Sequence, residues 1–324
     1  MAEWLFEAGI GENRAILIED GAIAEAVIEL PGLRAGAVVP ARLTSVLVPR
    51  RRGIATLESG EEALIEPIPA GLTEGAAFRA EILREAIPEA GRPKRALARP
   101  TQDPPHPGPS PEERFGVASQ PAHGPDRFEE AGWSDLLEEA ATGEIAFPGG
   151  ALRMSLTPAM TLFDVDGALP LADLAEAGAA AAARAIRRFG IGGSIGIDLP
   201  TLPDKAARQR AAAAVDALLP QPFERTAVNG FGFLQIVRRR ERPSLPEVLQ
   251  GDPIGAAARA LLRRGQRCGG QGILTLHAAP PVAAHLEAHP DWLDRLRREV
   301  GVAVVLQAEP GLAISAGHVQ RSPV

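Results

Sequence analysis

The chain has 324 residues, of which 45% are hydrophobic, 23% charged and only 4% aromatic, and its formal net charge is −7. This length is enough for two or three domains. The single cysteine, Cys268, excludes a disulfide scaffold and a cysteine-rich zinc site. No apolar run is long enough to span a bilayer, and the acidic start lacks the features of a signal peptide. We therefore expect a cytoplasmic protein with no membrane partner, whose overall charge shows no footprint for nucleic acid.

Short strands fill the first hundred residues. Segments 14–19 and 23–29 flank an Asp-Gly-Ala turn, which predicts a hairpin. Four more strands follow at a spacing of about ten residues, typical of a small barrel. They are expected at 38–48, 53–57, 62–65 and 78–87. The pattern predicts a five-stranded β-barrel.

A proline-rich stretch separates this part from the rest. Residues 100–125 contain eight prolines. Such a composition buries too little apolar surface to offset its ordering entropy, so it predicts a solvated linker. Deleting 104–124 is then expected to leave the melting temperature almost unchanged. A short helix should begin at Trp133.

Strands and helices alternate in the second half. A hairpin is expected at 144–147 and 151–157, followed by buried strands, helices and two further strands. These are strand 160–165, helix 171–189, strand 194–199, helix 203–219, and strands 225–228 and 232–239. The alternation predicts a parallel βαβ unit with a right-handed crossover. A smaller repeat closes the chain: helix 253–264, strand 272–277, helix 281–298, and strands 302–307 and 312–316.

Two aspartates follow the buried strands of this unit. Asp164 ends the first strand and Asp198 the second. Carboxyl ends of such strands meet at one edge of a sheet, so both carboxylates could reach one divalent cation. Asp166 shares the face of Asp164 if the strand continues that far. The alternative interpretation is that either aspartate caps the helix that follows it.

The stretch FDVDG (163–167) also fits the first motif of haloacid-dehalogenase-type phosphatases. That chemistry needs a later lysine to hold the phosphate, and only Lys205 follows. An acidic pair after a further strand is also missing. This reading is the less favoured one.

Five stretches, in this order and spacing, resemble the ribonuclease E/G family. They are ENRAILIEDGAIAEAVIE (12–29), GRPKRALAR (91–99), GEIAFPGGALRMSLTPAMTLFDVDG (143–167), ARAIRRFGIGGSIGIDLPTLPDKAARQR (183–210) and VNGFGFLQIVRRRERPSL (228–245). The resemblance covers most of residues 12–99 and 143–320.

The resemblance implies an α/β (α+β mixed) fold and a Mg²⁺-dependent endoribonuclease. An RNase H-like part is split by an inserted S1/OB-type β-barrel and followed by a DNase I-like α/β catalytic region and a small C-terminal α/β domain. The expected boundaries are 1–36 for the N-terminal hairpin, 37–99 for the barrel, 100–130 for the linker, 131–250 for the catalytic region and 251–324 for the last domain. Single-stranded RNA would be cut to 5′-phosphate and 3′-hydroxyl ends.

The same resemblance assigns roles to residues. Asp164 and Asp198 become the catalytic, Mg²⁺-binding pair, with Asp166 as a further metal ligand. Lys94, Arg95, Arg238 and Arg240 become RNA contacts.

Four departures separate this chain from the family pattern. The family has Asn where Asp166 stands, and its 5′-monophosphate sensor domain is replaced by 100–125. Cys268 stands alone where the family pairs two cysteines in a zinc-link, so a zinc-link dimer is not expected. The barrel strands carry Thr56, Leu64 and Ile65 instead of base-stacking phenylalanines. A catalytically weak or inactive RNA-binding protein of the same ancestry is therefore the alternative function.

Overall fold

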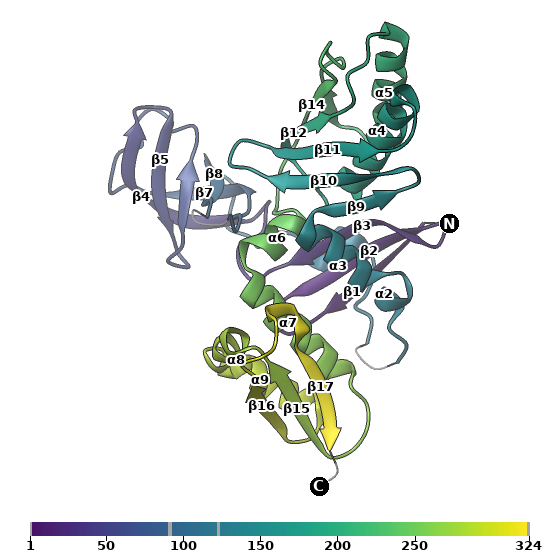
Figure 1. The fold of residues 1–324 in the computed structure, drawn as a ribbon. Coiled ribbons are helices and arrows are strands. Elements are labelled where there is room, and N and C mark those ends of the chain that lie inside the picture. Colours follow the sequence, from purple (N-terminus) through teal and green to yellow (C-terminus); the bar gives the residue numbers. More distant parts are fainter. Residues whose placement is uncertain (1, 90–92, 122–123, 323–324) are drawn as a thin grey trace.

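The computed structural model describes residues 2–89, 93–121 and 124–322 (Figure 1). Positions 91 and 92 of the stretch 91–99 lie outside the described residues. The chain is a mixed α/β protein with three open sheets and a closed five-stranded barrel. The described residues include no helix that combines the length and hydropathy needed to cross a membrane.

A three-stranded antiparallel sheet begins the chain. Its order is β1 (Glu3–Ala8), β2 (Asn13–Glu19) and β3 (Ala22–Glu29). The expected hairpin is confirmed as β2–β3. The sequence analysis missed β1, because glutamates on both sides of the buried residues Leu5 and Phe6 make the segment look polar.

The predicted barrel is confirmed, and it closes in the order β4-β5-β6-β8-β7. Its strands are β4 (Val38–Val48), β5 (Arg52–Leu57), β6 (Glu62–Ile65), β7 (Ala77–Arg84) and β8 (Ala96–Thr101). Small alanines alternate with Leu43, Ile65 and Ile82 in its core. This alternation of small and large side chains fills a narrow barrel.

The proline-rich segment packs against the first sheet, so the expectation of a solvated linker is wrong. Ser110 caps the short helix α1 (Pro111–Phe115). Phe115 is 8% exposed, and its ring centroid lies 4.8 Å from that of Trp4. The Gln120 amide donates to the Phe6 carbonyl at 2.6 Å. Trp4 and Phe6 give this sheet an apolar face, and one phenylalanine among the prolines is enough to anchor the segment to it.

The largest sheet has six strands in the order β13-β14-β12-β11-β10-β9. They are β9 (Glu144–Phe147), β10 (Gly150–Leu156), β11 (Thr161–Gly167), β12 (Gly193–Asp198), β13 (Phe223–Arg225) and β14 (Phe233–Arg238). Helices α2 (Arg127–Glu130) and α3 (Trp133–Thr142) precede it. Strands β11 and β12 are parallel, which confirms the βαβ unit.

Helix α4 (Leu171–Arg188) connects β11 to β12 and packs on one face of this sheet, beside α5 (Lys205–Leu218) (Figure 1). The approach is close: a Cβ on Gly178 would lie 2.3 Å from Val165. Alanines on α4 allow it to contact the sheet, α5 and β3 together. The opposite face of the sheet carries exposed side chains, and we call it the open face.

Helix α6 (Leu245–Gly251) leads into a C-terminal unit with a sheet ordered β16-β15-β17. Its elements are α7 (Pro253–Arg267), β15 (Ile273–Ala278), α8 (Pro280–Glu287), α9 (Pro290–Val300), β16 (Val304–Ala308), the 3₁₀ turn η1 (Ile314–Ala316) and β17 (His318–Ser322). Two expectations are wrong here. The helix expected over 281–298 is broken, because Pro290 starts a new helix instead of continuing the old one. The strand expected at 312–316 lies at 318–322, after the turn.

Four hydrophobic clusters organise these elements, and the smallest joins Phe6, Ala15 and Val27 of the first sheet to Phe115 of α1. The first sheet, the six-stranded sheet and helices α3 to α6 share one core. The barrel and the C-terminal unit each have their own. Residues before and after the barrel therefore belong to the same packed body.

Candidate functional site

Asp164 and Asp198 face each other across neighbouring parallel strands. They are paired in register at the ends of the β11–β12 ladder. Such strands lie about 4.8 Å apart, so both side chains stand together on the open face. Both residues are exposed, while their strand neighbours Phe163 and Ile197 are fully buried against the helices. Alternation along each strand thus places the carboxylates in solvent and the apolar side chains in the core.

Neither aspartate caps a helix, so the alternative interpretation is wrong. Helix α4 has Pro170 at its N-cap. Helix α5 is capped by Asp204, whose carboxylate accepts hydrogen bonds from the Ala206 and Ala207 amides at 3.1 and 3.0 Å. The two strand-end carboxylates have no such role.

The pair is the centre of a row that crosses the sheet. In register, one residue from each of five strands stands in line: Glu144, Arg153, Asp164, Asp198 and Phe233. Residues opposite each other in a ladder project to the same face. We call this set the open-face row; it places a cation on one side of the carboxylate pair and an aromatic ring on the other.

Arg153 is the basic residue nearest to the pair along this row. Its Nε lies 3.1 Å from Glu144 Oε1, and its side chain remains 63% exposed. The ion pair orients the guanidinium without burying it. Arg153 is therefore available to an anion that approaches Asp164, and the sequence analysis did not single it out.

Asp166 shares the face of Asp164, as the sequence analysis expects. It is exposed and lies opposite Ala151 on β10, two residues beyond the last β11–β12 pair. The described residues contain no group of three or more His, Cys, Asp or Glu side chains arranged to hold a metal ion. The role of Asp166 as a ligand remains a prediction.

The donor chemistry of the pair suits Mg²⁺. Carboxylate oxygens are hard ligands, and Mg²⁺ commonly binds proteins through one or two of them while it keeps several waters. The exposed open face leaves room for those waters. Asp164 and Asp198 are thus the residues that could hold such an ion.

Two phenylalanines lie at and just before the start of β14, the strand that pairs with the end of β12, and the sequence analysis missed them as a functional feature. Phe233 is the ladder partner of Asp198, and a Cβ on Gly196 would lie 2.5 Å from its ring. The ring therefore lies over Gly196, and the Leu162 side chain approaches the same glycine from the neighbouring strand, since the same Cβ would lie 2.8 Å from it. Phe231, two residues earlier, is 83% exposed. The only signal in the sequence is the pattern GFGF.

The four predicted RNA contacts lie elsewhere. Arg238 pairs with Gly193 at the opposite end of β12, five residues and about 17 Å from Asp198. Its Nη1 donates to the Ile191 carbonyl at 3.1 Å, and burial lowers its pKa. Arg95 forms an exposed ion pair with Glu62 at 2.7 Å.

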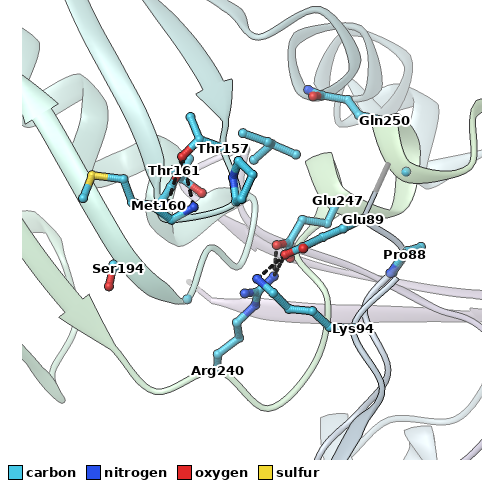
Figure 2. A pocket seen from close by; sticks show the side chains of 15 residues that line it. Pro88, Glu89, Lys94, Thr157, Met160, Thr161, Ser194, Arg240, Glu247 and Gln250 are labelled. Atoms are coloured by element: carbon cyan, nitrogen blue, oxygen red, sulfur yellow. Dashed lines mark hydrogen bonds and ion pairs between the residues drawn. The ribbon is translucent and has the colours of Figure 1, made fainter. Parts of the chain in front are cut away.

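Arg240 and Lys94 line a cavity between the barrel end and the six-stranded sheet (Figure 2). The cavity has a volume of about 240 Å³. Arg240 forms an ion pair with Glu247 and lies 3.8 Å from Glu89, which also pairs with Lys94. Burial is the first cause that lowers the Arg240 pKa. These cations are neutralised by carboxylates and do not face the aspartate pair.

Of the three barrel residues that replace base-stacking phenylalanines, two lie at the barrel surface. Ile65 is fully buried in the barrel core, so it does not stand at a binding surface. Thr56 and Leu64 are half-buried. The tip between β4 and β5 is both basic and apolar: it carries three arginines, 50 to 52, beside exposed Leu47 and Val48.

In comparisons with known proteins, no family model and no curated protein sequence matches this chain.

Proposed function

We propose that this chain is a Mg²⁺-dependent endoribonuclease of the ribonuclease E/G type, which hydrolyses single-stranded RNA to 5′-phosphate and 3′-hydroxyl ends. The observation that carries the proposal is the in-register pair Asp164 and Asp198 on an open sheet face. Two carboxylates at this spacing have few structural uses, because like charges side by side repel each other.

The organisation of the chain supports the same proposal. The segments before and after the barrel share one hydrophobic core, and the barrel has its own. This is the arrangement expected of an RNase H-like part split by an S1-type barrel and continued by a DNase I-like region. Closed barrels of this size commonly bind oligonucleotides through their strand faces and loops. The barrel tip carries Arg50, Arg51 and Arg52, of which Arg51 and Arg52 also pair with Glu66, so Arg50 is the first candidate for a phosphate contact.

The open-face row suggests how the chemistry is divided. Asp164 and Asp198 hold the metal, and Arg153 contacts a phosphate oxygen beside them. When bound, Mg²⁺ supplies a more acidic water and offsets charge on the phosphate. The reaction adds water across the P–O3′ bond: oxygen joins phosphorus, and the proton goes to the departing 3′-oxygen.

The test is cleavage of a 5′-labelled single-stranded RNA with and without Mg²⁺. Wild type should cut only with Mg²⁺, and Asp164→Asn and Asp198→Asn should each abolish cleavage while RNA affinity changes little. Asp294→Asn, an exposed aspartate on α9, is the matched control and should cut like wild type. Normal cleavage by either row variant would falsify the proposal.

The second candidate is an RNA-binding protein without turnover. The closed barrel favours it, because a barrel of this kind can bind single strands without the aspartate pair. In the same assay it predicts RNA binding by wild type and by both row variants, with no cleavage at any Mg²⁺ concentration.

A further inference from the structure

Phe231 is held in a position where it contributes nothing to the core. At 83% exposed it is the most exposed of the large hydrophobic side chains on the described surface. Single exposed hydrophobic side chains are common on protein surfaces, so exposure alone gives Phe231 no role. Its loop, however, has a dense set of hydrogen bonds.

Asn229 organises this loop. Its Oδ1 accepts hydrogen bonds from the amides of Phe231 and Phe233 at 2.9 and 3.0 Å. The Asn229 amide donates to the Phe233 carbonyl at 3.0 Å, and Thr201 Oγ1 donates to the Phe231 carbonyl at 3.3 Å. The phenyl ring of Phe231 is therefore presented from an ordered backbone.

The loop is also tied to the strand end that carries Asp198. The Leu199 amide donates to the Gly232 carbonyl at 3.2 Å. Gly232 has a φ of 95°, which favours glycine, and a Cβ there would lie 2.1 Å from the Leu199 carbonyl oxygen. The loop that carries Phe231 is thus held against Leu199, the residue after Asp198, by a close backbone contact that only glycine allows.

We infer that Phe231, together with Phe233 and Leu162, forms a stacking subsite for one unpaired nucleobase next to the scissile phosphate. The inference rests on the proposed function. Phe233 stands beside Asp198 in the open-face row, and Arg153 stands on the far side of Asp164. A phosphate over the carboxylates then has a cation on one side and an apolar surface on the other.

The chemistry of this surface identifies its occupant. Phenyl rings offer no hydrogen bonds, so they bind the face of a base and do not read its sequence. Bases in a duplex are already stacked on their neighbours and cannot reach the rings. The subsite therefore selects single-stranded RNA with little base preference, one nucleotide from the cut.

The test begins with binding in EDTA, where no cleavage interferes. Phe231→Ala should bind a short single-stranded RNA about 5- to 150-fold more weakly than wild type, the range of one base–aromatic stack. Phe231→Trp should restore affinity, whereas Phe231→Leu, which keeps apolar area but not the ring, should not. Val305→Ala, which truncates an exposed side chain of the C-terminal unit, is the matched control and should bind like wild type.

A set of RNAs, each with one abasic site, locates the base. At one position the abasic site should weaken wild type but add nothing to Phe231→Ala, because both changes remove the same stack. With Mg²⁺, wild type should cut next to that position. Equal abasic penalties for wild type and Phe231→Ala at every position would overturn the subsite.

The outcomes separate this inference from the proposed function. Coupled binding losses without any cleavage would keep the subsite and reject the nuclease. Aspartate-dependent cleavage with full affinity in Phe231→Ala would keep the nuclease and reject the subsite. Because Phe231 is outside the core, an unchanged melting temperature should show that its variants are folded.

Discussion

Removing the charge of Asp198 should stabilise the metal-free protein. Asp164 and Asp198 stand in register on neighbouring strands, and both are exposed. Two unit charges about 5 Å apart repel each other by roughly 0.8 kcal/mol at the dielectric constant of water. Asp198→Asn removes this repulsion and keeps the shape of the side chain.

Arg153 reduces the expected gain. It lies two strands from Asp198, about 10 Å away, so its attraction is roughly half the repulsion and is screened by salt. We expect the variant to be about 0.5 kcal/mol more stable in EDTA at low salt. For a chain of this size the melting temperature should rise by about 0.7 °C.

Mg²⁺ should make wild type more stable than Asp198→Asn. An ion that binds only the folded protein stabilises it by about 1.4 kcal/mol when its concentration is ten times Kd. Wild type should gain this stability and Asp198→Asn should lose most of it, so the two Mg²⁺ titration curves should cross. The assay is thermal unfolding in EDTA and across a Mg²⁺ series, with no RNA present.

Asp294→Asn separates this effect from a general change of charge. Asp294 lies 2.6 Å from Arg297, so its substitution removes an attraction and should not stabilise the protein. It should retain the full Mg²⁺ response. Parallel curves for wild type and Asp198→Asn would refute the shared cation site, whatever the cleavage assay gives.

Four further predictions concern other parts of the chain. Phe115→Ala should lower the free energy of unfolding by about 3 kcal/mol, measured by urea denaturation against the exposed control Glu112→Gln, because it removes a buried ring packed on Trp4; a loss below about 1 kcal/mol would mean that the segment is not anchored. Asp166→Asn should raise the Mg²⁺ concentration for half-maximal cleavage by about five- to tenfold, since its carboxylate attracts the ion from about 7 Å; superimposable titration curves would exclude this role. Burial lowers the pKa of His285, so the fold favours the neutral ring; wild type should lose more stability than His285→Gln when the pH falls through the range just below about 6.5. RNA with a 5′-triphosphate or 5′-hydroxyl should be cut as readily as 5′-monophosphate RNA, and a preference above about tenfold would reveal a sensor.

The sequence predicts the carboxylate pair well because its signal is local. Alternation in TLFDVDG and SIGID orients each side chain, and the right-handed crossover of the connecting helix places the strands side by side. The barrel is predictable in part for the same reason, since β4, β5 and β6 are neighbours both along the chain and in the sheet. Strand β8 and its parallel pairing with β6 have no such local signal.

The missed features depend on long-range contacts. The composition of 100–125 favours disorder. The segment is ordered because Phe115 packs on Trp4 and Phe6, which lie more than a hundred residues earlier in the chain. Arg153 and Phe233 join the site only through the register of β10 and β14 with the aspartate strands. The spacing of residues along the chain does not predict which residues of two neighbouring strands will pair.

The predicted basic contacts require a different interpretation. Lys94 and Arg240 come from separate elements and share Glu89, while Arg240 also pairs with Glu247 (Figure 2). Two cations and two carboxylates leave the cavity without net charge. An RNA phosphate would have to displace a carboxylate from a partly buried arginine, which costs free energy.

Backbone contacts lie beside this cluster. The Glu85 amide donates to the Glu241 carbonyl at 2.8 Å, and a Cβ on Gly251 would lie 1.5 Å from the Pro88 carbonyl oxygen. Charge pairs and backbone contacts together fix the end of the barrel against the six-stranded sheet. Lys94 and Arg240 therefore belong to the contact that joins the barrel end to the rest of the chain.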